Sequence, residues 1–395
     1  MEIKKARYWW KRASLRTFVV APILFQKRIR DLFRGGGAPQ EAPSRIALFV
    51  SMELLGGGIL ITAISKTLRQ LYPQATIFLV GEQHRAGKLT GFYKAHSCID
   101  EVIICPVRGG STFRQWVRFY QMLKTYNLDM CILAPNHSCS DSVWLYLLGI
   151  PQIVGAYLPK VWERHSWIEN KFLTKRLTAV HMAEHPYRLI SFPRAYARAL
   201  TDRLDLELEE LVPFIRFEDA GLPIAPKGPL VVMHPGGPPK KRWRPEGYAA
   251  IGRKLVQELG AVIFIIGGWP EKELGEQLRK EIVAACPEGQ VINCCGAVMN
   301  ETITYVSRST MYVGNNAGPI YLAMALGIPI VGVFRGKDRS FSGPDAVGDQ
   351  HRLVSRENID EVPVNEVWST IEGRWREIAA SSPQTTEAVS ALGNA

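Results

Sequence analysis

Short apolar runs of three to six residues recur along the chain, and most of them are followed by a turn and a segment with helical spacing. Residues 45–51 form one such run and residues 76–80 the next, with glycines at 56–58 and helical spacing over 59–71 between them. Runs of this length are typical of parallel strands buried on both faces, because such strands have no polar side. The order of strand, glycine loop, helix and strand predicts a βαβ unit.

The same order continues through the first half of the chain and restarts at residue 229. We predict further strands at 101–105, 130–133, 153–155, 229–233, 261–266, 291–293, 311–313 and 329–334, and helices at 113–126, 140–148, 246–259, 271–285 and 320–326. The predicted fold class is therefore α/β, with two Rossmann-like, doubly wound domains that face a central cleft. In such folds a ligand binds outside the carboxyl ends of the strands.

Changes in composition divide the 395 residues into five parts. A basic, aromatic leader and its linker cover residues 1–43, and an N-terminal, Rossmann-like domain covers 44–212. Prolines within 213–228 indicate a hinge between domains. A C-terminal, ligand-binding domain covers 229–380, and the small, polar residues 381–395 indicate a disordered tail.

The net charge of +11 is concentrated at the start of the chain. Residues 1–43 hold ten basic and three acidic residues, a net +7, which leaves +4 for all the others. A body this mildly basic argues against nucleic-acid binding. Within residues 1–34, Tyr8, Trp9 and Trp10 lie among lysines and arginines, which favours contact with the anionic inner leaflet of a membrane. The alternative is a solvated basic tail.

Several classes of protein are disfavoured by what the sequence lacks. It has no run of about 18–20 apolar residues that could span a bilayer, and the leader lacks the features of a secretory signal, which favours a cytoplasmic protein. The seven cysteines are scattered and form no CxxC pair, so we expect no metal site and no bound cofactor. The absence of a GxGxxG or Walker motif argues against a dehydrogenase or a P-loop NTPase.

Three loops of the second half are predicted to meet at one edge of its sheet. In the first, His234-Pro-Gly-Gly leaves backbone N–H groups accessible, and the basic run Lys240-Lys241-Arg242 follows. In the second, Glu271 opens a helix and can accept hydrogen bonds from helix N–H groups or ribose hydroxyls. The third, residues 314–319, precedes a helix whose free N–H groups favour an anion. Each loop alone also fits ordinary turn or capping chemistry, but together they indicate a phosphate-bearing ligand such as a nucleotide sugar.

These segments resemble glycosyltransferase family 9, the bacterial heptosyltransferases that build the inner core of lipopolysaccharide. The resemblance covers residues 45–360 and rests on His-Pro-Gly at 234–236, Lys-Arg-Trp at 241–243, Gly-Gly-x-x-Glu at 267–271 and Gly-Asn-Asn-Ala-Gly-Pro-Ile-Tyr at 314–321. It implies a GT-B fold with the donor in the C-terminal domain and the acceptor in the N-terminal domain, and an inverting, metal-independent reaction. It also implies that donor phosphates contact Lys241, the ribose contacts Glu271, and the diphosphate and sugar contact residues 316–319. The full implied donor-binding set is His234, Gly236, Lys241, Glu271, Asn316, Ala317, Gly318, Pro319 and Tyr321.

The sequence departs from this family where a catalytic base is expected. Family members carry an Asp in the first glycine loop, and the matching position here is Gly57, within the acceptor-side loop Gly56-Gly57-Gly58. Transfer to a hydroxyl needs a proton acceptor, which glycine cannot supply. Glu53, in the same loop, is our candidate replacement base; the alternative is a solvated or capping glutamate.

Two readings of function follow. The first is a glycosyltransferase, cytoplasmic and peripheral on the inner membrane, that moves a sugar from a nucleoside diphosphate donor to a lipopolysaccharide core or other lipid-linked saccharide. By resemblance the donor is ADP-heptose. The alternative is a catalytically silent homologue that binds a nucleotide sugar or glycolipid or acts as an assembly partner. Gly57 favours this alternative. Asn316 and Tyr321 stand where the family has Asp and His and keep hydrogen bonding without the charge, which is expected either of a different donor or of a protein that has lost catalysis.

Overall fold

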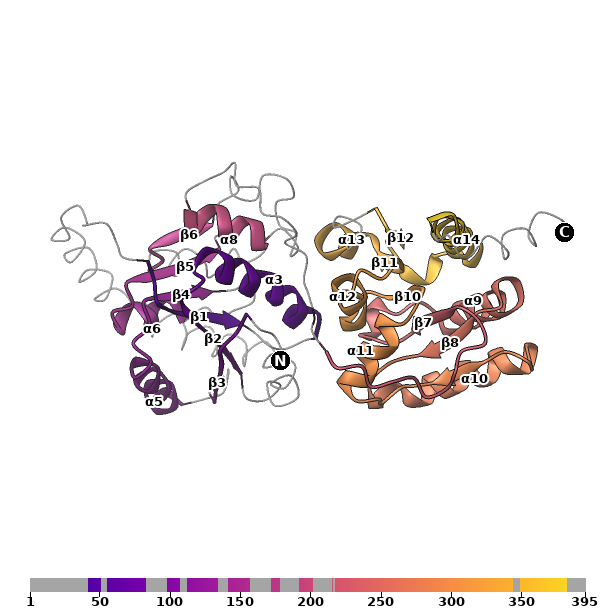
Figure 1. Ribbon diagram of the computed structural model, residues 1–395, viewed down its shortest axis with the longest axis horizontal. Helices are drawn as coiled ribbons and strands as arrows, with labels where there is room; N and C mark the ends of the chain where they lie inside the picture. The colour runs from indigo at the N-terminus through magenta and orange to yellow at the C-terminus, as the bar shows by residue number, and fades with distance from the viewer. Residues whose placement is uncertain are drawn as a thin grey trace, which may run out of the picture.

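The molecule consists of two α/β lobes that lie side by side (Figure 1). The computed structural model describes residues 42–50, 55–82, 98–106, 112–133, 141–156, 172–177, 192–201, 215, 217–343 and 349–381. Glu53, the predicted leader up to residue 41 and the predicted tail beyond residue 381 lie outside the described residues.

Each lobe is built on a six-stranded sheet in which every pair of neighbouring strands is parallel. The first sheet has the order β3 (Glu101–Cys105), β2 (Thr76–Glu82), β1 (Arg45–Val50), β4 (Met130–Leu133), β5 (Gln152–Ala156) and β6 (Lys175–Leu177). The second has the order β12 (His351–Arg356), β11 (Ile330–Arg335), β10 (Met311–Asn315), β7 (Leu230–His234), β8 (Val262–Ile265) and β9 (Val291–Asn293). In both sheets the strand order reverses beside the first strand, which is where ligands bind in doubly wound folds.

Helices cover both faces of each sheet. On the first sheet, α3 (Leu55–Leu71) and α8 (Phe192–Thr201) pack on one face, and α5 (Phe113–Lys124) and α6 (Asp141–Leu147) on the other. On the second, α11 (Met299–Ser307) and α12 (Gly318–Ala325) pack on one face, and α9 (Pro245–Leu259), α10 (Lys272–Ala285) and α14 (Val364–Ser381) on the other. Helix α13 (Gly336–Ser342) adjoins β11 and β12. The predicted α/β fold class with two doubly wound sheets is thereby confirmed.

One local prediction is wrong: Gly56, Gly57 and Gly58 do not form a loop but lie in the first turn of α3. Glycine costs about 1 kcal/mol in a helix interior. Ile59 and Leu68, which follow in the same helix, are fully buried, and this burial favours the helix.

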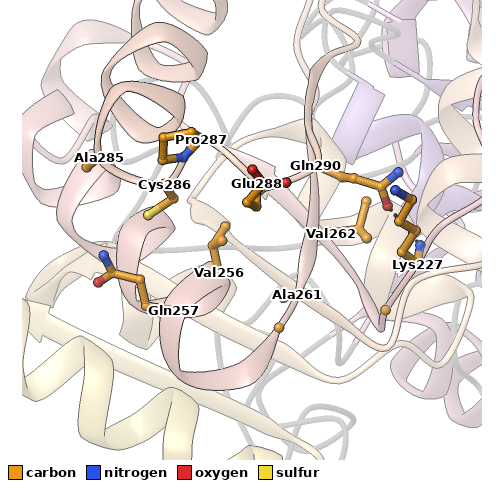
Figure 2. Close-up of a pocket in the computed structure, with 13 residues that line it drawn as sticks. Lys227, Val256, Gln257, Ala261, Val262, Ala285, Cys286, Pro287, Glu288 and Gln290 are labelled. Carbon is orange, nitrogen blue, oxygen red and sulfur yellow. Dashed lines mark hydrogen bonds between the residues drawn. The ribbon is translucent and has the colours of Figure 1, made fainter.

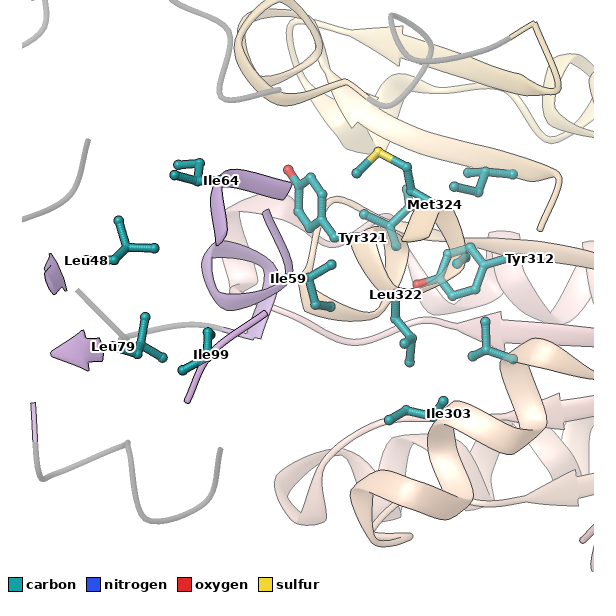
Figure 3. Packing of buried hydrophobic residues seen from close by; sticks show 14 of the residues in the cluster. Leu48, Ile59, Ile64, Leu79, Ile99, Ile303, Tyr312, Tyr321, Leu322 and Met324 are labelled. Atoms are coloured by element: carbon teal, nitrogen blue, oxygen red, sulfur yellow. The ribbon is translucent and has the colours of Figure 1, made fainter. Parts of the chain in front are cut away.

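The two lobes share one apolar core where α3 meets α12. Figure 3 shows Ile59 of α3 facing Tyr321 and Leu322 of α12, and all three side chains are at most 7% exposed. The helix that begins in the third predicted loop therefore packs directly on the first lobe.

The described part of the predicted hinge, residues 215 and 217–228, lies against the second lobe. The Ala220 N–H donates to Thr304 Oγ1 of α11 at 2.9 Å, and Asp219 pairs with Arg308. No described helix is long and apolar enough to cross a membrane.

Figure 2 shows a cavity of about 390 Å³ beside the amino ends of β7, β8 and β9. Its lining comes from the residues that precede these strands and from the α9 and α10 ends, among them Lys227, Ala261 and Gln290. It therefore lies at the opposite edge of the second sheet from the three predicted loops.

Candidate functional site

The three loops of the second half leave three neighbouring strands at one edge of the sheet. The His234 loop follows β7, the Gly267 loop follows β8, and the Asn316 loop follows β10, in the spatial order β8, β7, β10. Strands β7 and β10 are the pair between which the strand order reverses. The structure therefore brings together the loops that the sequence analysis singled out.

Glu271 joins the first two loops through its carboxylate. Oε1 accepts a hydrogen bond from the Gly237 N–H at 2.6 Å, and Oε2 accepts one from the Gly268 N–H at 2.6 Å. Gly236 lies so close that a Cβ there would stand 2.2 Å from Oε1. Arg242 completes the arrangement, because its Nε donates to the Gly237 carbonyl at 2.5 Å and its Nη2 lies 4.0 Å from Oε1. Gly236 thus leaves the space that this carboxylate needs.

Asn315 joins the first and third loops and was missed by the sequence analysis. Its Oδ1 accepts from the Trp243 N–H at 3.0 Å and from the Tyr248 hydroxyl at 2.7 Å. Its Nδ2 donates to the carbonyls of Pro235 at 2.9 Å and Gly236 at 3.0 Å. The side chain is fully buried, so four hydrogen bonds satisfy it without solvent. An Asn at the last position of a strand, followed by a glycine-containing helix start, was the available signal.

His234 is held neutral at the end of β7. Burial lowers the pKa of this imidazole to about 4; the nearby Glu271 carboxylate opposes that shift, and Arg242 adds to it. Only 2% of the residue is exposed, and Nδ1 has no hydrogen-bond partner among the described residues. The Tyr312 hydroxyl, beneath Gly314 on the neighbouring strand, is likewise buried without a partner in the described part of the chain. At neutral pH His234 can therefore act as a hydrogen-bonding group but not as a cation.

The basic run after the first loop divides into a fixed and a free part. Arg242 is engaged with the loop as described above, whereas Lys241 is half-buried at the end of the 3₁₀ turn Pro239–Lys241. Within the described residues the Lys241 ammonium group makes no ion pair or hydrogen bond. Lys241, like the exposed Lys240 before it, can therefore turn toward an anion in front of the loops.

The third loop leads into α12, whose first turn has no side-chain cap. Ala317 is its N-cap residue, and Gly318 and Pro319 open the helix. Uncapped N–H groups at a helix start favour an anion. Asn316 is 4% exposed, and its Oδ1 accepts from the Tyr321 hydroxyl at 3.2 Å. Tyr321 itself is packed between the two lobes, and its hydroxyl meets the third loop at Asn316.

Other features of the described chain bear on the chemistry. No group of three His, Cys, Asp or Glu side chains within the described ranges could hold a metal ion. Cys294 and Cys295 follow β9 and are buried, and burial raises the pKa of each thiol to about 12. These thiols are therefore protonated and unreactive at neutral pH.

A family model decides the relationship. The model described as glycosyltransferase family 9 (heptosyltransferase) matches residues 116–367, well over half of the chain. The chain belongs to glycosyltransferase family 9. Lipooligosaccharide heptosyltransferase 2 of Haemophilus influenzae is 24% identical over 119 residues, which are 29% of this chain and 34% of that protein. The match to this curated relative therefore spans about a third of the relative's length.

Solved structures of heptosyltransferases show the same fold as this family 9 chain. The E. coli ADP-heptose LPS heptosyltransferase II has a TM-score of 0.65 at 15% identity, covering 85% of this chain and 99% of its own. A family 9 glycosyltransferase from Veillonella parvula has a TM-score of 0.67 at 16% identity, and the match covers 86% of this chain and 100% of that protein. The E. coli heptosyltransferase WaaC, with ADP-2-deoxy-2-fluoro heptose, has a TM-score of 0.61 at 15% identity. The match covers 83% of this chain and 99% of WaaC. The predicted GT-B fold is confirmed.

Proposed function

We propose that this family 9 protein transfers a sugar from a nucleoside diphosphate donor bound at the carboxyl edge of the second sheet. The observation that carries the proposal is the joining of three loops at the point where the strand order reverses. Lys241 lies beside these loops, and its ammonium group makes no ion pair or hydrogen bond among the described residues. The relative WaaC has ADP-2-deoxy-2-fluoro heptose in its solved structure, which supports ADP-heptose as the donor. The acceptor in this proposal is a lipopolysaccharide core or other lipid-linked saccharide, held by the first lobe.

The chemistry follows from the groups at this edge. The acceptor hydroxyl attacks the anomeric carbon, the bond from that carbon to the diphosphate oxygen breaks, and the configuration inverts. Lys241 and the Gly318 N–H at the start of α12 stabilise the charge that develops on the leaving diphosphate. The proton of the hydroxyl passes to a base, for which Glu53 is the candidate.

Calorimetry with ADP-heptose and ADP tests the donor site. Replacing a phosphate-binding lysine removes a charge-assisted interaction, so Lys241→Ala should weaken ADP roughly tenfold. Lys240→Ala is the matched control, because this neighbouring lysine is exposed and lies outside the proposed contacts. Equal affinities for wild type and Lys241→Ala would remove Lys241 from the donor site.

Transfer assays with a lipid-A-type acceptor test the base. Glu53→Gln should abolish transfer while ADP affinity stays unchanged, because the substitution removes only the proton acceptor. Unaltered turnover would eliminate Glu53 as the base.

The second candidate, a silent homologue that binds the donor without transferring it, is favoured by Gly57 at the family's Asp position. Gly57→Asp restores a carboxylate in the first turn of α3, where none is present and where an acidic residue is stabilising. Donor binding without turnover across a panel of nucleoside diphosphate sugars, together with transfer gained in Gly57→Asp, would select this candidate.

We further propose that residues 1–34 hold the protein on the inner leaflet, which would place it beside a lipid-linked acceptor. Ten basic residues within 1–43, together with interfacial aromatic residues, support this. Co-sedimentation should show binding to vesicles containing anionic lipid, reduced by salt, and no binding to neutral vesicles. Equal binding to duplex DNA would instead indicate a non-specific basic tail.

A further inference from the structure

Two large apolar side chains stand exposed at the carboxyl edge of the second sheet. Trp269 is 70% exposed and Val298 is 65% exposed, and among the described residues only Leu147, in the first lobe, joins them as an exposed large hydrophobic side chain. Trp269 lies in the 3₁₀ turn Trp269–Glu271 after β8, and Val298 is the N-cap residue of α11 after β9. An exposed tryptophan at the mouth of a site offers a large, rigid apolar face on which a ligand can pack.

The loops that carry these two side chains are fastened to each other. The Gly296 N–H donates to the Gly267 carbonyl at 2.8 Å. Gly296 has a φ of +90°, and a Cβ there would lie 3.4 Å from Trp269 Cδ2, so the indole lies against this glycine. The Lys272 ammonium nitrogen lies 4.5 Å from the indole ring centroid. The ring is therefore held in place by its own surroundings while most of its surface stays open to solvent.

The position of this pair along the edge matches the position of a nucleobase. The phosphate-binding loops follow β10 and β7, Glu271 follows β8, and the apolar pair stands at β8 and β9. With neighbouring strands about 4.8 Å apart, β10 and β9 are separated by about 14 Å. In doubly wound folds the pyrophosphate lies at the reversal of strand order and an acidic residue at the neighbouring strand contacts the ribose. A nucleotide extended from β10 past Glu271 brings its base to Trp269.

We propose that Trp269, flanked by Val298, is the surface on which the donor's nucleobase stacks, and that it selects purine over pyrimidine nucleotides by area of contact. This inference rests on the proposed donor site and assigns its base-binding part. Stacking on an indole uses the face of the base and not its hydrogen-bonding edge. Adenine and guanine nucleotides should therefore bind similarly, and both should bind more tightly than those of uracil or cytosine.

Calorimetry on the full chain tests this with ADP, UDP and pyrophosphate as probes. Stacking of a base on an aromatic side chain supports roughly a 5- to 100-fold loss of ADP affinity in Trp269→Ala. Trp269→Phe should retain most of the affinity, because it keeps an aromatic face. The preference for ADP over UDP should shrink in Trp269→Ala, while pyrophosphate affinity stays unchanged. Leu147→Ala is the matched control, an exposed apolar residue of the first lobe, and should match wild type.

The outcomes separate this inference from the proposed function. If wild type binds ADP and Trp269→Ala binds it equally well, the stacking surface is wrong and the donor site stands. If Trp269→Ala loses pyrophosphate as strongly as ADP, the residue acts through the Glu271 loop, and the stacking surface is again wrong. If wild type binds no nucleoside diphosphate and no pyrophosphate, both proposals fail.

Discussion

Strands β1 and β7 occupy the same place in the two sheets, yet the segments after them differ. After β1, helix α3 begins at Leu55 and takes three glycines into its first turn. After β7, helix α9 begins only at Pro245, and the intervening residues form the loop that Glu271 and Asn315 fasten. Both segments contain consecutive glycines, so glycine alone does not decide whether a segment forms a helix or a loop.

Proline accounts for the difference. The segment after β7 reads His234-Pro-Gly-Gly-Pro-Pro, and three prolines without N–H groups cannot continue a helix. Residues 55–72 contain no proline, and Ile59, the first residue after the glycines, is fully buried. The first lobe therefore presents a helix start to its neighbour, whereas the second presents a fixed, backbone-lined loop.

The largest effect is expected where the loop after β7 depends on one side chain. Asn315→Ala removes four hydrogen bonds and leaves buried donors and acceptors unpaired, so we expect a loss of roughly 3–5 kcal/mol in the free energy of unfolding. Denaturant unfolding measures it. Asn315→Asp keeps the Oδ1 acceptor but turns a second carboxylate oxygen toward the Pro235 and Gly236 carbonyls, so it should also be strongly destabilising. Small losses in both variants would show that Asn315 does not hold the loops together.

His234 should make stability depend on pH. Its pKa is about 4 in the folded chain and about 6.5 when unfolded, so the unfolded state binds the extra proton. The stabilisation is complete above pH 6.5 and is lost as pH falls toward 4, by on the order of 3 kcal/mol. The difference between wild type and His234→Gln, measured by denaturant unfolding from pH 7 to pH 4, isolates this histidine. A constant difference across that range would contradict its buried, neutral state.

Glu271→Gln tests the link between the loops after β7 and β8. Glutamine can accept from only one of the Gly237 and Gly268 N–H groups and presents its own NH₂ to the other. We expect a loss of roughly 1–3 kcal/mol of unfolding free energy. Glu258→Gln, on the exposed Lys254 pair of α9, is the control and should change little. A similar small effect at both positions would mean that the backbone holds the loops without Glu271.

The smallest effect is expected in α3. Gly57→Ala should raise stability by up to about 1 kcal/mol, because alanine is the better helix former. Gly237→Ala should do the opposite, since its φ of +106° disfavours any side chain. Thermal unfolding compares the two. Destabilisation by Gly57→Ala as large as that by Gly237→Ala would show that the first-lobe glycines also serve a special backbone geometry.

Much of this architecture could be predicted from the sequence, because apolar runs and helical spacing report local burial directly. The strands at 101–105, 130–133 and 291–293 have their predicted bounds. The helical glycines at 56–58 could not be predicted from local preference, because packing on the sheet and on α12 outweighs it. Asn315 was missed for a related reason: its four partners lie within residues 235–248, 67 to 80 positions earlier in the sequence, so only the fold brings them to it. The roles of Lys241 and Glu271 in donor binding stay predictions.

Hydrogen exchange of the backbone amides, with and without ADP, tests the central claim most directly. The donor site proposed here predicts slower exchange in residues 234–238, 267–271 and 315–321 when ADP is added, with α5 and α6 of the first lobe unchanged. Protection confined to other segments, or no protection at saturating ADP, would contradict a diphosphate site at this edge of the second sheet.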